Sequence, residues 1–261
     1  MDYTFSARTD PGLLRRNNED AVIVDESSGV AVLADGMGGY NAGEIASAMA
    51  TTLIAGELAR CLAAGTAAKP ADDIGRVLAT SVDNANQAIL RAARHNPDYR
   101  DMGTTLVAGI FFGDRLFLTH VGDSRCYRLR GGDLTQITKD HSMLQEQVDA
   151  GLIHREDTSV TSSRHILTRA LGVDPELQFE VTIHAVAAGD FYLMCSDGLT
   201  DMVDDASIAS LMGQENNIGK LASALINLAN AKGGRDNIAV VLIHAKDAPG
   251  QPGKLPVLFV S

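Results

Sequence analysis

The sequence predicts an α+β fold in which two antiparallel β-sheets pack together and helices cover their outer faces. Short runs of β-branched residues separated by tight turns fill the centre of the chain. Helical patterns occur as one pair before most of these runs and a second pair after them. The strands do not alternate strictly with helices, which disfavours a doubly wound parallel sheet.

A hairpin and a long helix come first. The turn residues Glu26 to Gly29 separate two β-branched runs at residues 20–25 and 29–35, which predicts a hairpin. Apolar residues then recur every three or four positions from Ile45 to Leu62, which predicts a helix. Asn41 and Glu44 just before this stripe resemble a capping box, with Asn in place of Ser or Thr.

A second helix and a meander of strands follow. An apolar stripe from Ile74 to Ile89 predicts a helix over about residues 72–95. Gly113-Asp114 marks a tight hairpin turn, and glycine-rich turns separate the next runs. The strands predicted for this meander are residues 103–112, 115–121 and about 125–130.

The remaining chain combines an irregular insert with the second pair of helices. Residues 142–150 predict a short helix, and residues 151–175 have weak periodicity and many polar side chains, as functional loops often do. Gly233-Gly234 is a helix stop signal. The elements predicted in this part are strands at 179–185 and 190–195, helices at about 204–212 and 217–231, and a last strand at 237–244.

The length and the ending of the chain favour one domain with a short extension. No segment resembles a linker before about residue 246, so we expect one domain over residues 1–246. Three of the seven prolines lie beyond Lys246, which predicts a loosely held extension over residues 247–261.

Composition and charge disfavour several classes of partner. The formal charge of −11 would repel nucleic acid and anionic membranes, and the chain has no Trp and few aromatic residues on which bases could stack. The first ten residues lack a signal pattern, and no uninterrupted apolar run reaches about 18 residues, so we expect a cytoplasmic protein without a membrane span. Cys61, Cys126 and Cys195 show no metal or redox spacing and are interpreted as buried reduced thiols.

The pattern that points to chemistry is a set of acidic residues at strand ends. Most adjoin glycine, and the set consists of Glu19-Asp20, Asp35-Gly36, Asp123, Asp197 and Asp236. A carboxylate beside a buried strand is costly unless it is paired or binds a cation, and hard divalent cations prefer oxygen ligands. Any single Asp-Gly pair is most simply a turn. Several such pairs, each abutting a strand, favour a metal centre.

Other interpretations of the motifs are weaker. The chain has no G-x-S-x-G, H-E-x-x-H or P-loop pattern, and Asp35 to Gly39 lacks the lysine of a phosphate-binding loop. His120 and His141 lie near the acidic residues but fit structural roles better than metal ligation. Arg15 and Arg16 are either a phosphate-binding pair or an ordinary solvated pair on an acidic protein.

Taken in order, these segments resemble the metal-dependent protein phosphatases, the PPM or type 2C family, in its short bacterial form. The resemblance covers about residues 5–245. The matching segments are Arg15 to Asp20, Asp35 to Gly39, Gly103 to Thr105, Val121 to Arg125, Leu167 to Gly172, Ser196 to Leu199 and Gly234 to Ile238.

The resemblance implies a four-layer α-β-β-α sandwich with a metal site at one end that holds two core Mn²⁺ or Mg²⁺ ions, with a place for a third, weaker one. It implies that Asp35 bridges the core ions and that Gly36 offers its carbonyl oxygen. Asp197 and Asp236 would complete the first ion, Glu19 and Asp20 would serve the second, and Asp123 would help to hold the third. Arg15 would grip the substrate phosphate, with Asn237 as support, and residues 145–175 would form a flap beside the site.

The resemblance further implies hydrolysis of phosphoserine and phosphothreonine in proteins by a metal-bridging hydroxide, in opposition to a bacterial Ser/Thr kinase. Animal members often carry a histidine proposed as general acid where this chain has Met37, which leaves the proton donor open. The alternatives are a catalytically weak phosphoprotein-binding module of the same fold and a metal-dependent nuclease or nucleotide hydrolase. We expect a monomer.

Overall fold

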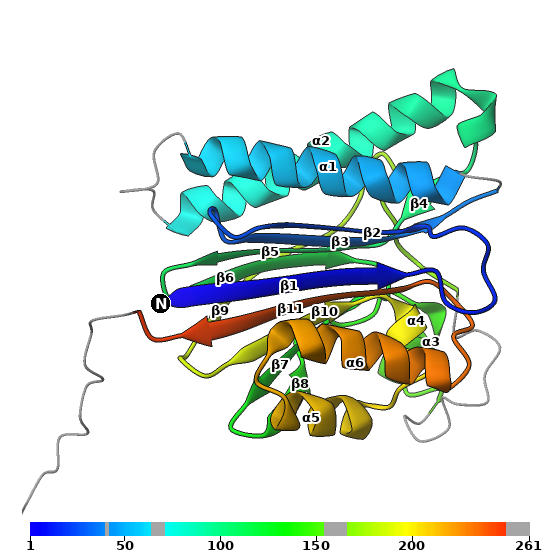
Figure 1. Ribbon diagram of the computed structural model, residues 1–261. Coiled ribbons are helices and arrows are strands. Elements are labelled where there is room, and N and C mark those ends of the chain that lie inside the picture. The colour runs from blue at the N-terminus through cyan, green and yellow to red at the C-terminus, as the bar shows by residue number, and fades with distance from the viewer. Residues whose placement is uncertain (40–41, 64–70, 154–165, 249–261) are drawn as a thin grey trace, which may run out of the picture.

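Two antiparallel sheets stack face to face in the computed structural model, which describes residues 1–39, 42–63, 71–153 and 166–248 (Figure 1). One sheet has the order β1-β11-β10-β7-β8 and the other β2-β3-β5-β6-β9, with β4 paired to β3. The first sheet consists of β1 (Asp2–Asp10), β7 (Arg125–Arg130), β8 (Asp133–Gln136), β10 (Phe191–Cys195) and β11 (Ile238–Lys246). The second consists of β2 (Asp20–Asp25), β3 (Val30–Met37), β4 (Gly103–Thr104), β5 (Leu106–Phe112), β6 (Arg115–Val121) and β9 (Val181–Ala185).

Helix pairs cover both outer faces, as the sequence predicts (Figure 1). Helices α1 (Ala42–Ala63) and α2 (Ala71–His95) cover the second sheet, and α5 (Asp205–Gln214) and α6 (Ile218–Ala231) cover the first. Shorter helices connect these elements: a 3₁₀ turn (Pro97–Tyr99), α3 (Met143–Asp149) and α4 (Asp197–Thr200). The α+β class and the four layers are therefore confirmed.

The apolar core follows from this layering. The inner faces of the two sheets meet in a cluster that includes Leu33, Phe111, Tyr192 and Val241. A second cluster joins α1 and α2 to their sheet, and a third joins α5 and α6 to theirs. The inner strands β3, β5, β10 and β11 are buried almost throughout, because each has one face on the opposite sheet and the other under a helix. Such rigid central strands hold the residues at their ends in fixed positions.

Four elements are absent from the sequence prediction, namely β1, β8, α4 and the 3₁₀ turn (Pro97–Tyr99). β1 is polar at many positions because it is an edge strand, yet it pairs with β11 along its whole length from Asp2 to Asp10. β8 is a short edge strand whose alternation is too brief to detect. α4 is a single turn that begins at Asp197, inside a motif that was interpreted as a strand end. The strand expected over 103–112 is divided at Thr105, and the cap expected at Asn41 lies outside the described residues.

α1 needs separate comment because of its composition. Of the described helices, it alone is long and apolar enough to qualify by length and composition as a membrane span. The sequence analysis considered only uninterrupted apolar runs and did not identify it. Ile54 and Leu58 are fully buried in the layer between α1, α2 and the sheet, so the apolar content of α1 is explained by packing in the protein core.

Candidate active site

The predicted acidic residues come together at one end of the sandwich, on the right in Figure 1. β2 starts there and β3 ends there, and Asp20 faces Asp35 directly across this antiparallel pair. β10 ends there, with Asp197 following it, and β11 starts there just after Asp236. Strand register and the antiparallel order of both sheets therefore bring together carboxylates from four distant segments of the chain.

Asp20 is the most deeply buried of these carboxylates. Its Oδ2 accepts a 2.7 Å hydrogen bond from the Ser196 hydroxyl, whereas its Oδ1 has no partner in the described structure. Burial raises the pKa of Asp20 to about 7, and the neighbouring Asp236 and Glu19 charges add to the rise, while hydrogen bonds from Ser196 and Asp35 oppose it. A buried carboxylate oxygen without a donor is a free ligand position.

Asp35 lies at the centre of the acidic cluster. Its backbone is fixed to the next strand, because its N–H donates to the Thr105 hydroxyl at 3.0 Å and its carbonyl accepts from the Thr105 N–H at 2.8 Å. Burial raises the pKa of Asp35 well above its ordinary value, and the rise is reinforced by the carboxylates of Asp20, Asp197, Asp123 and Asp236, in decreasing order. A rigid backbone thus holds this side chain among like charges.

Asp197, which follows β10 of the first sheet, is surrounded by like charges, as Asp35 is in the second sheet. Burial raises the pKa of Asp197 well above its ordinary value, and Asp123 and Asp201 are the strongest charged contributors. Asp123, in the turn between β6 and β7, has its pKa raised to about 6 by burial and then by the Asp140 charge. Both carboxylates therefore face the same cluster as Asp35.

Gly36 has no room for a side chain. A Cβ there would lie 2.1 Å from the Gly43 carbonyl oxygen and 2.8 Å from the Glu19 carbonyl oxygen. The Gly36 N–H also donates to the Glu19 carbonyl at 3.1 Å. This close approach places the Asp35-Gly36 backbone directly against the Glu19 segment and the start of α1.

Arg15 and Asp236 form an ion pair at the mouth of the cluster. Arg15 Nη2 lies 2.7 Å from Asp236 Oδ2, and both side chains are partly exposed. They line a pocket of about 390 Å³ together with Asp197, Asp201, Met202 and Arg235. The arginine predicted to hold phosphate is therefore beside the carboxylates and is engaged by one of them.

Asn237 fastens the loop that carries Arg15 and Glu19. Its side-chain oxygen accepts from the Glu19 N–H at 2.8 Å, and its amide donates to the carbonyls of Pro11 at 3.0 Å and Asn17 at 2.9 Å. The side chain is almost fully buried. These contacts agree with the supporting position expected for Asn237.

The donors present fit hard divalent cations. The cluster supplies carboxylate and carbonyl oxygens without thiol or imidazole ligands, which is the chemistry of Mg²⁺ and Mn²⁺ sites. The partnerless oxygen of Asp20 and the mutual repulsion around Asp35 are both relieved by bound positive charge. Among the described residues, no three His, Cys, Asp or Glu side chains are close enough to hold an ion alone. Backbone carbonyls and water are further oxygen ligands that such ions accept.

The raised pKa values predict an unusual pH dependence for EDTA-treated protein. Asp20 and Asp123 have folded-state pKa values of about 7 and 6, above the ordinary value of 3.8, so they bind protons more tightly in the folded state. The resulting stability is present below about pH 4 and is lost as pH rises through 6 and 7, at a scale of about 2 kcal/mol or more. Urea unfolding at pH 5 and pH 8 should show this loss, and added Mn²⁺ should reverse it at pH 8. Equal stability at pH 5 and pH 8 without metal would show that the pKa values of Asp20 and Asp123 are not raised in the folded protein.

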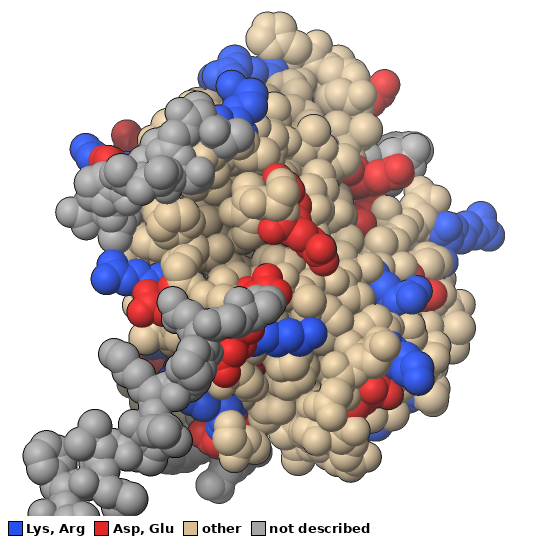
Figure 2. All heavy atoms as spheres, turned by 60° about the vertical axis from the view of Figure 1, so that its left-hand side comes forward, with Lys and Arg blue, Asp and Glu red and all other residues tan. Residues whose placement is uncertain are grey.

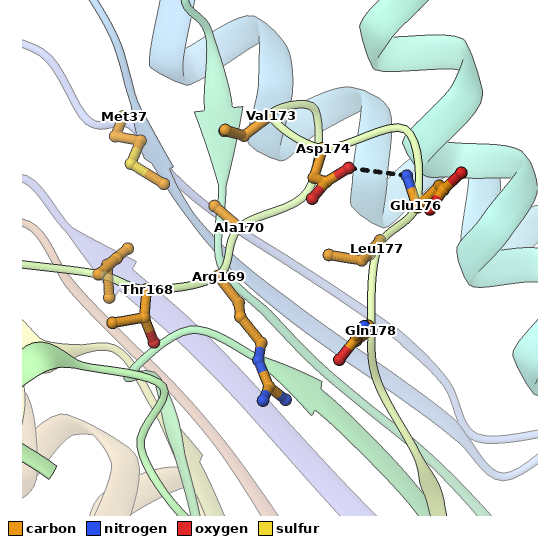
Figure 3. A pocket seen from close by; sticks show the side chains of 10 residues that line it. Met37, Thr168, Arg169, Ala170, Val173, Asp174, Glu176, Leu177 and Gln178 are labelled. Atoms are coloured by element: carbon orange, nitrogen blue, oxygen red, sulfur yellow. Dashed lines mark hydrogen bonds between the residues drawn. The ribbon is translucent and has the colours of Figure 1, made fainter. Parts of the chain in front are cut away.

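A second pocket of about 500 Å³ lies beside Met37 (Figure 3). Figure 3 shows Met37 from β3 pointing toward the same space as Val173 and Leu177, which belong to the loop before β9. Thr168 and Arg169 lie along the side of this space. Residues 166–175 of this loop belong to the flap expected over residues 145–175, of which residues 154–165 lie outside the described structure. Its C-terminal part is anchored, because Leu171 forms a bridge with Thr104.

The structure adds residues that the sequence analysis did not select. Asp201 lines the Arg15 pocket and raises the pKa of Asp197 and Asp123. The sequence signal for Asp201 is its position four residues after Asp197, because residues about one helical turn apart lie on the same face of a helix. Ser196 was noted in the sequence only as the first residue of the matching segment Ser196 to Leu199. His141 is structural as expected, since its ring Nδ1 accepts from the Gly122 N–H at 3.2 Å and the ring stacks on His120.

The layered fold with a carboxylate cluster at one end and an arginine at its mouth has the arrangement that the resemblance to the metal-dependent protein phosphatases implies. The family model described as Protein phosphatase 2C matches residues 15–231. The chain therefore belongs to the protein phosphatase 2C family, and the resemblance recognised in the sequence is confirmed.

Similar proteins come from bacteria and are described as serine/threonine phosphatases. The chain is 41% identical to the serine/threonine protein phosphatase PstP of Mycobacterium tuberculosis over 93% of its length, but spans only 45% of that relative. It is 36% identical to the serine/threonine phosphatase stp of Listeria innocua over 91% of its length and 94% of the relative. The solved catalytic domain of PstP in complex with two manganese ions matches with 40% identity and a TM-score of 0.83, covering 94% of this chain and 99% of that domain.

Proposed function

We propose that this protein hydrolyses phosphoserine and phosphothreonine in other proteins with the help of two divalent cations at the acidic cluster. The observation that carries this proposal is the convergence of Asp20, Asp35, Asp197 and Asp236 around a space where their charges repel one another. The PstP catalytic domain in complex with two manganese ions supports Mn²⁺ at this position. Mg²⁺ accepts the same oxygen donors, and a third ion beside Asp123 is part of the proposal.

The roles proposed for the residues follow from their positions. Asp35 is central and would touch both core ions, with the Gly36 carbonyl, Asp197 and Asp236 at one of them. Glu19 and Asp20 would serve the other, and Asp123 would serve the third. When bound, such ions supply Lewis acidity that activates a water for attack on phosphorus.

Arg15 would bind the phosphoryl oxygens of the substrate. A guanidinium group offers several N–H donors in a plane and pairs well with phosphate. In the structure this group pairs with Asp236. Cation binding at Asp236 would satisfy that carboxylate and leave Arg15 free to turn to the phosphate. The same residue would thus balance charge in the metal-free state and hold substrate in the loaded one.

The wider setting is also proposed. We infer a cytoplasmic monomer that reverses the action of a bacterial Ser/Thr protein kinase, with residues 1–246 as the catalytic domain and residues 145–175 as a flap that governs access. On the face that Figure 2 shows, acidic and basic side chains are interspersed. This distribution does not favour a nucleic-acid partner.

The deciding experiment measures hydrolysis of p-nitrophenyl phosphate and of a phosphothreonine peptide with Mn²⁺, with Mg²⁺ and with EDTA. We expect turnover with Mn²⁺ on both substrates and its loss with EDTA, because the carboxylates alone cannot generate a nucleophile. Tight peptide binding without turnover in any metal would instead identify a phosphoprotein-binding module. Hydrolysis of nucleotides or nucleic acid in preference to the peptide would favour the nuclease or nucleotide-hydrolase alternative.

A further inference from the structure

A second arginine lies in the same pocket as Arg15. Arg235 lines the pocket of about 390 Å³ with Arg15 and Asp236, and its side chain is exposed. Within the described residues, Arg235 forms no ion pair or side-chain hydrogen bond, whereas Arg15 is paired with Asp236. The pocket therefore presents one guanidinium group engaged by a carboxylate and one whose donors have no acceptor in the described part of the chain.

The backbone that carries Arg235 is tightly specified. Gly233 and Gly234 have φ values of 133° and 48°, in the region that favours glycine. A Cβ at Gly234 would lie 2.4 Å from Asn230 Oδ1 and 2.9 Å from Leu13 Cγ. The loop is therefore packed against its neighbours, and Arg235 leaves it from a defined position.

The loops of the two arginines are also fastened to each other. The Gly234 carbonyl accepts from the Leu13 N–H at 2.7 Å and from the Leu14 N–H at 3.3 Å. The Arg15–Asp236 ion pair joins the next residues of the same two segments. Arg15 and Arg235 are thus carried by two segments that are fastened together, and both line the pocket to which Asp197 and Asp201 also contribute.

We infer that Arg235 is a specificity-determining residue that binds an anionic group next to the phosphorylated residue of the substrate. This inference rests on the proposed function, because Arg15 must hold the phosphate that is cleaved. A partly exposed guanidinium with free donors recognises carboxylate or phosphate by charge-assisted, often bidentate, hydrogen bonds. Arg235 therefore favours phosphopeptides that carry a flanking acidic residue or a second phosphate over peptides with neutral flanks.

The test measures turnover of three phosphopeptides of equal length by the full protein in the presence of Mn²⁺. One has neutral residues around the phosphoserine, one has glutamates there, and one has a second phosphoserine. The variants are Arg235→Gln and Arg235→Lys, and the matched control is Arg60→Gln, since Arg60 is an exposed arginine in the last turn of α1 that does not line the pocket. p-Nitrophenyl phosphate, which has no flanking residues, reports on the reaction centre.

We expect Arg235→Gln to raise KM by about tenfold for one or both anionic peptides, the scale of one charge-assisted hydrogen bond. kcat, and KM for p-nitrophenyl phosphate and the neutral peptide, should stay within about twofold of wild type, and Arg235→Lys should recover part of the loss. A shift confined to the glutamate peptide or to the doubly phosphorylated one supports the inference and identifies the group bound.

Three results separate failure of this inference from failure of the proposed function. If the wild type is active and Arg235→Gln has the wild-type KM for every peptide, the role of Arg235 is overturned. An equal loss on every substrate would also overturn it, because that pattern indicates damage to the reaction centre. A wild type that turns over none of the phosphopeptides would reject the proposed function itself.

Discussion

Replacing Asp35 with Asn should abolish most turnover while making the metal-free protein more stable. The carboxylate lies among Asp20, Asp197, Asp123 and Asp236, and their repulsion and its burial raise its pKa well above the ordinary value. Asn keeps the size and removes the charge, so the crowding falls and so does the attraction for cations. We expect kcat/KM with Mn²⁺ to fall by at least about 100-fold, as when one preorganised electrostatic group is lost.

The two effects have opposite signs, which separates them from general damage. In EDTA, the stability advantage of Asp35→Asn over wild type should grow as pH rises, because burial and the neighbouring carboxylates oppose ionisation of the wild-type carboxyl and raise its pKa, whereas Asn has no charge to acquire. Urea unfolding measures this difference, and calorimetric titration with Mn²⁺ measures the lost affinity. Asp83→Asn, at an exposed position of α2, is the matched control and should leave both quantities unchanged. Wild-type turnover in Asp35→Asn would exclude Asp35 from the metal centre.

The four layers of the sandwich could be predicted from the sequence because strand and helix patterns are strong where burial is complete. The stripe from Ile74 to Ile89 became the buried face of α2, and the apolar run before Cys195 became a central strand. β1 was missed because an edge strand is polar on its exposed side, and its nine-residue pairing with β11 is a long-range contact. Local pattern carries no information on such a partner.

The candidate site was predictable as a set of residues but not as a geometry. Acidic residues next to glycine at strand ends drew attention to Asp35 and Asp197 from spacing alone. That Asp20 stands directly opposite Asp35, or that Arg15 pairs with Asp236, depends on register and on loop packing over more than 200 residues of separation. Asp201 was missed because its only signal is the spacing of four residues from Asp197, and the single turn between them is too short to show a periodic pattern.

Asn237→Ala should weaken both stability and activity through the loop that carries Arg15. The side chain makes three hydrogen bonds, to the Glu19 N–H and to the carbonyls of Pro11 and Asn17. Alanine would leave these buried backbone groups without partners, at a cost of about 2–4 kcal/mol in the free energy of unfolding. The loop would then hold Arg15 and Glu19 less firmly, so KM for a phosphopeptide should rise and kcat should fall.

The comparison with an exposed asparagine distinguishes a positioning role from a general loss of packing. Asn227→Ala, on the surface of α6, should change the unfolding free energy by less than about 0.5 kcal/mol and leave kinetics intact. Hydrogen exchange should show faster exchange at the Glu19 amide in Asn237→Ala, with protection of β10 and β11 maintained. Unchanged Glu19 exchange together with unchanged KM would show that the loop is held by other contacts, such as those of Leu13 and Leu14 with Gly234. The metal centre would then owe its shape to the strand ends alone.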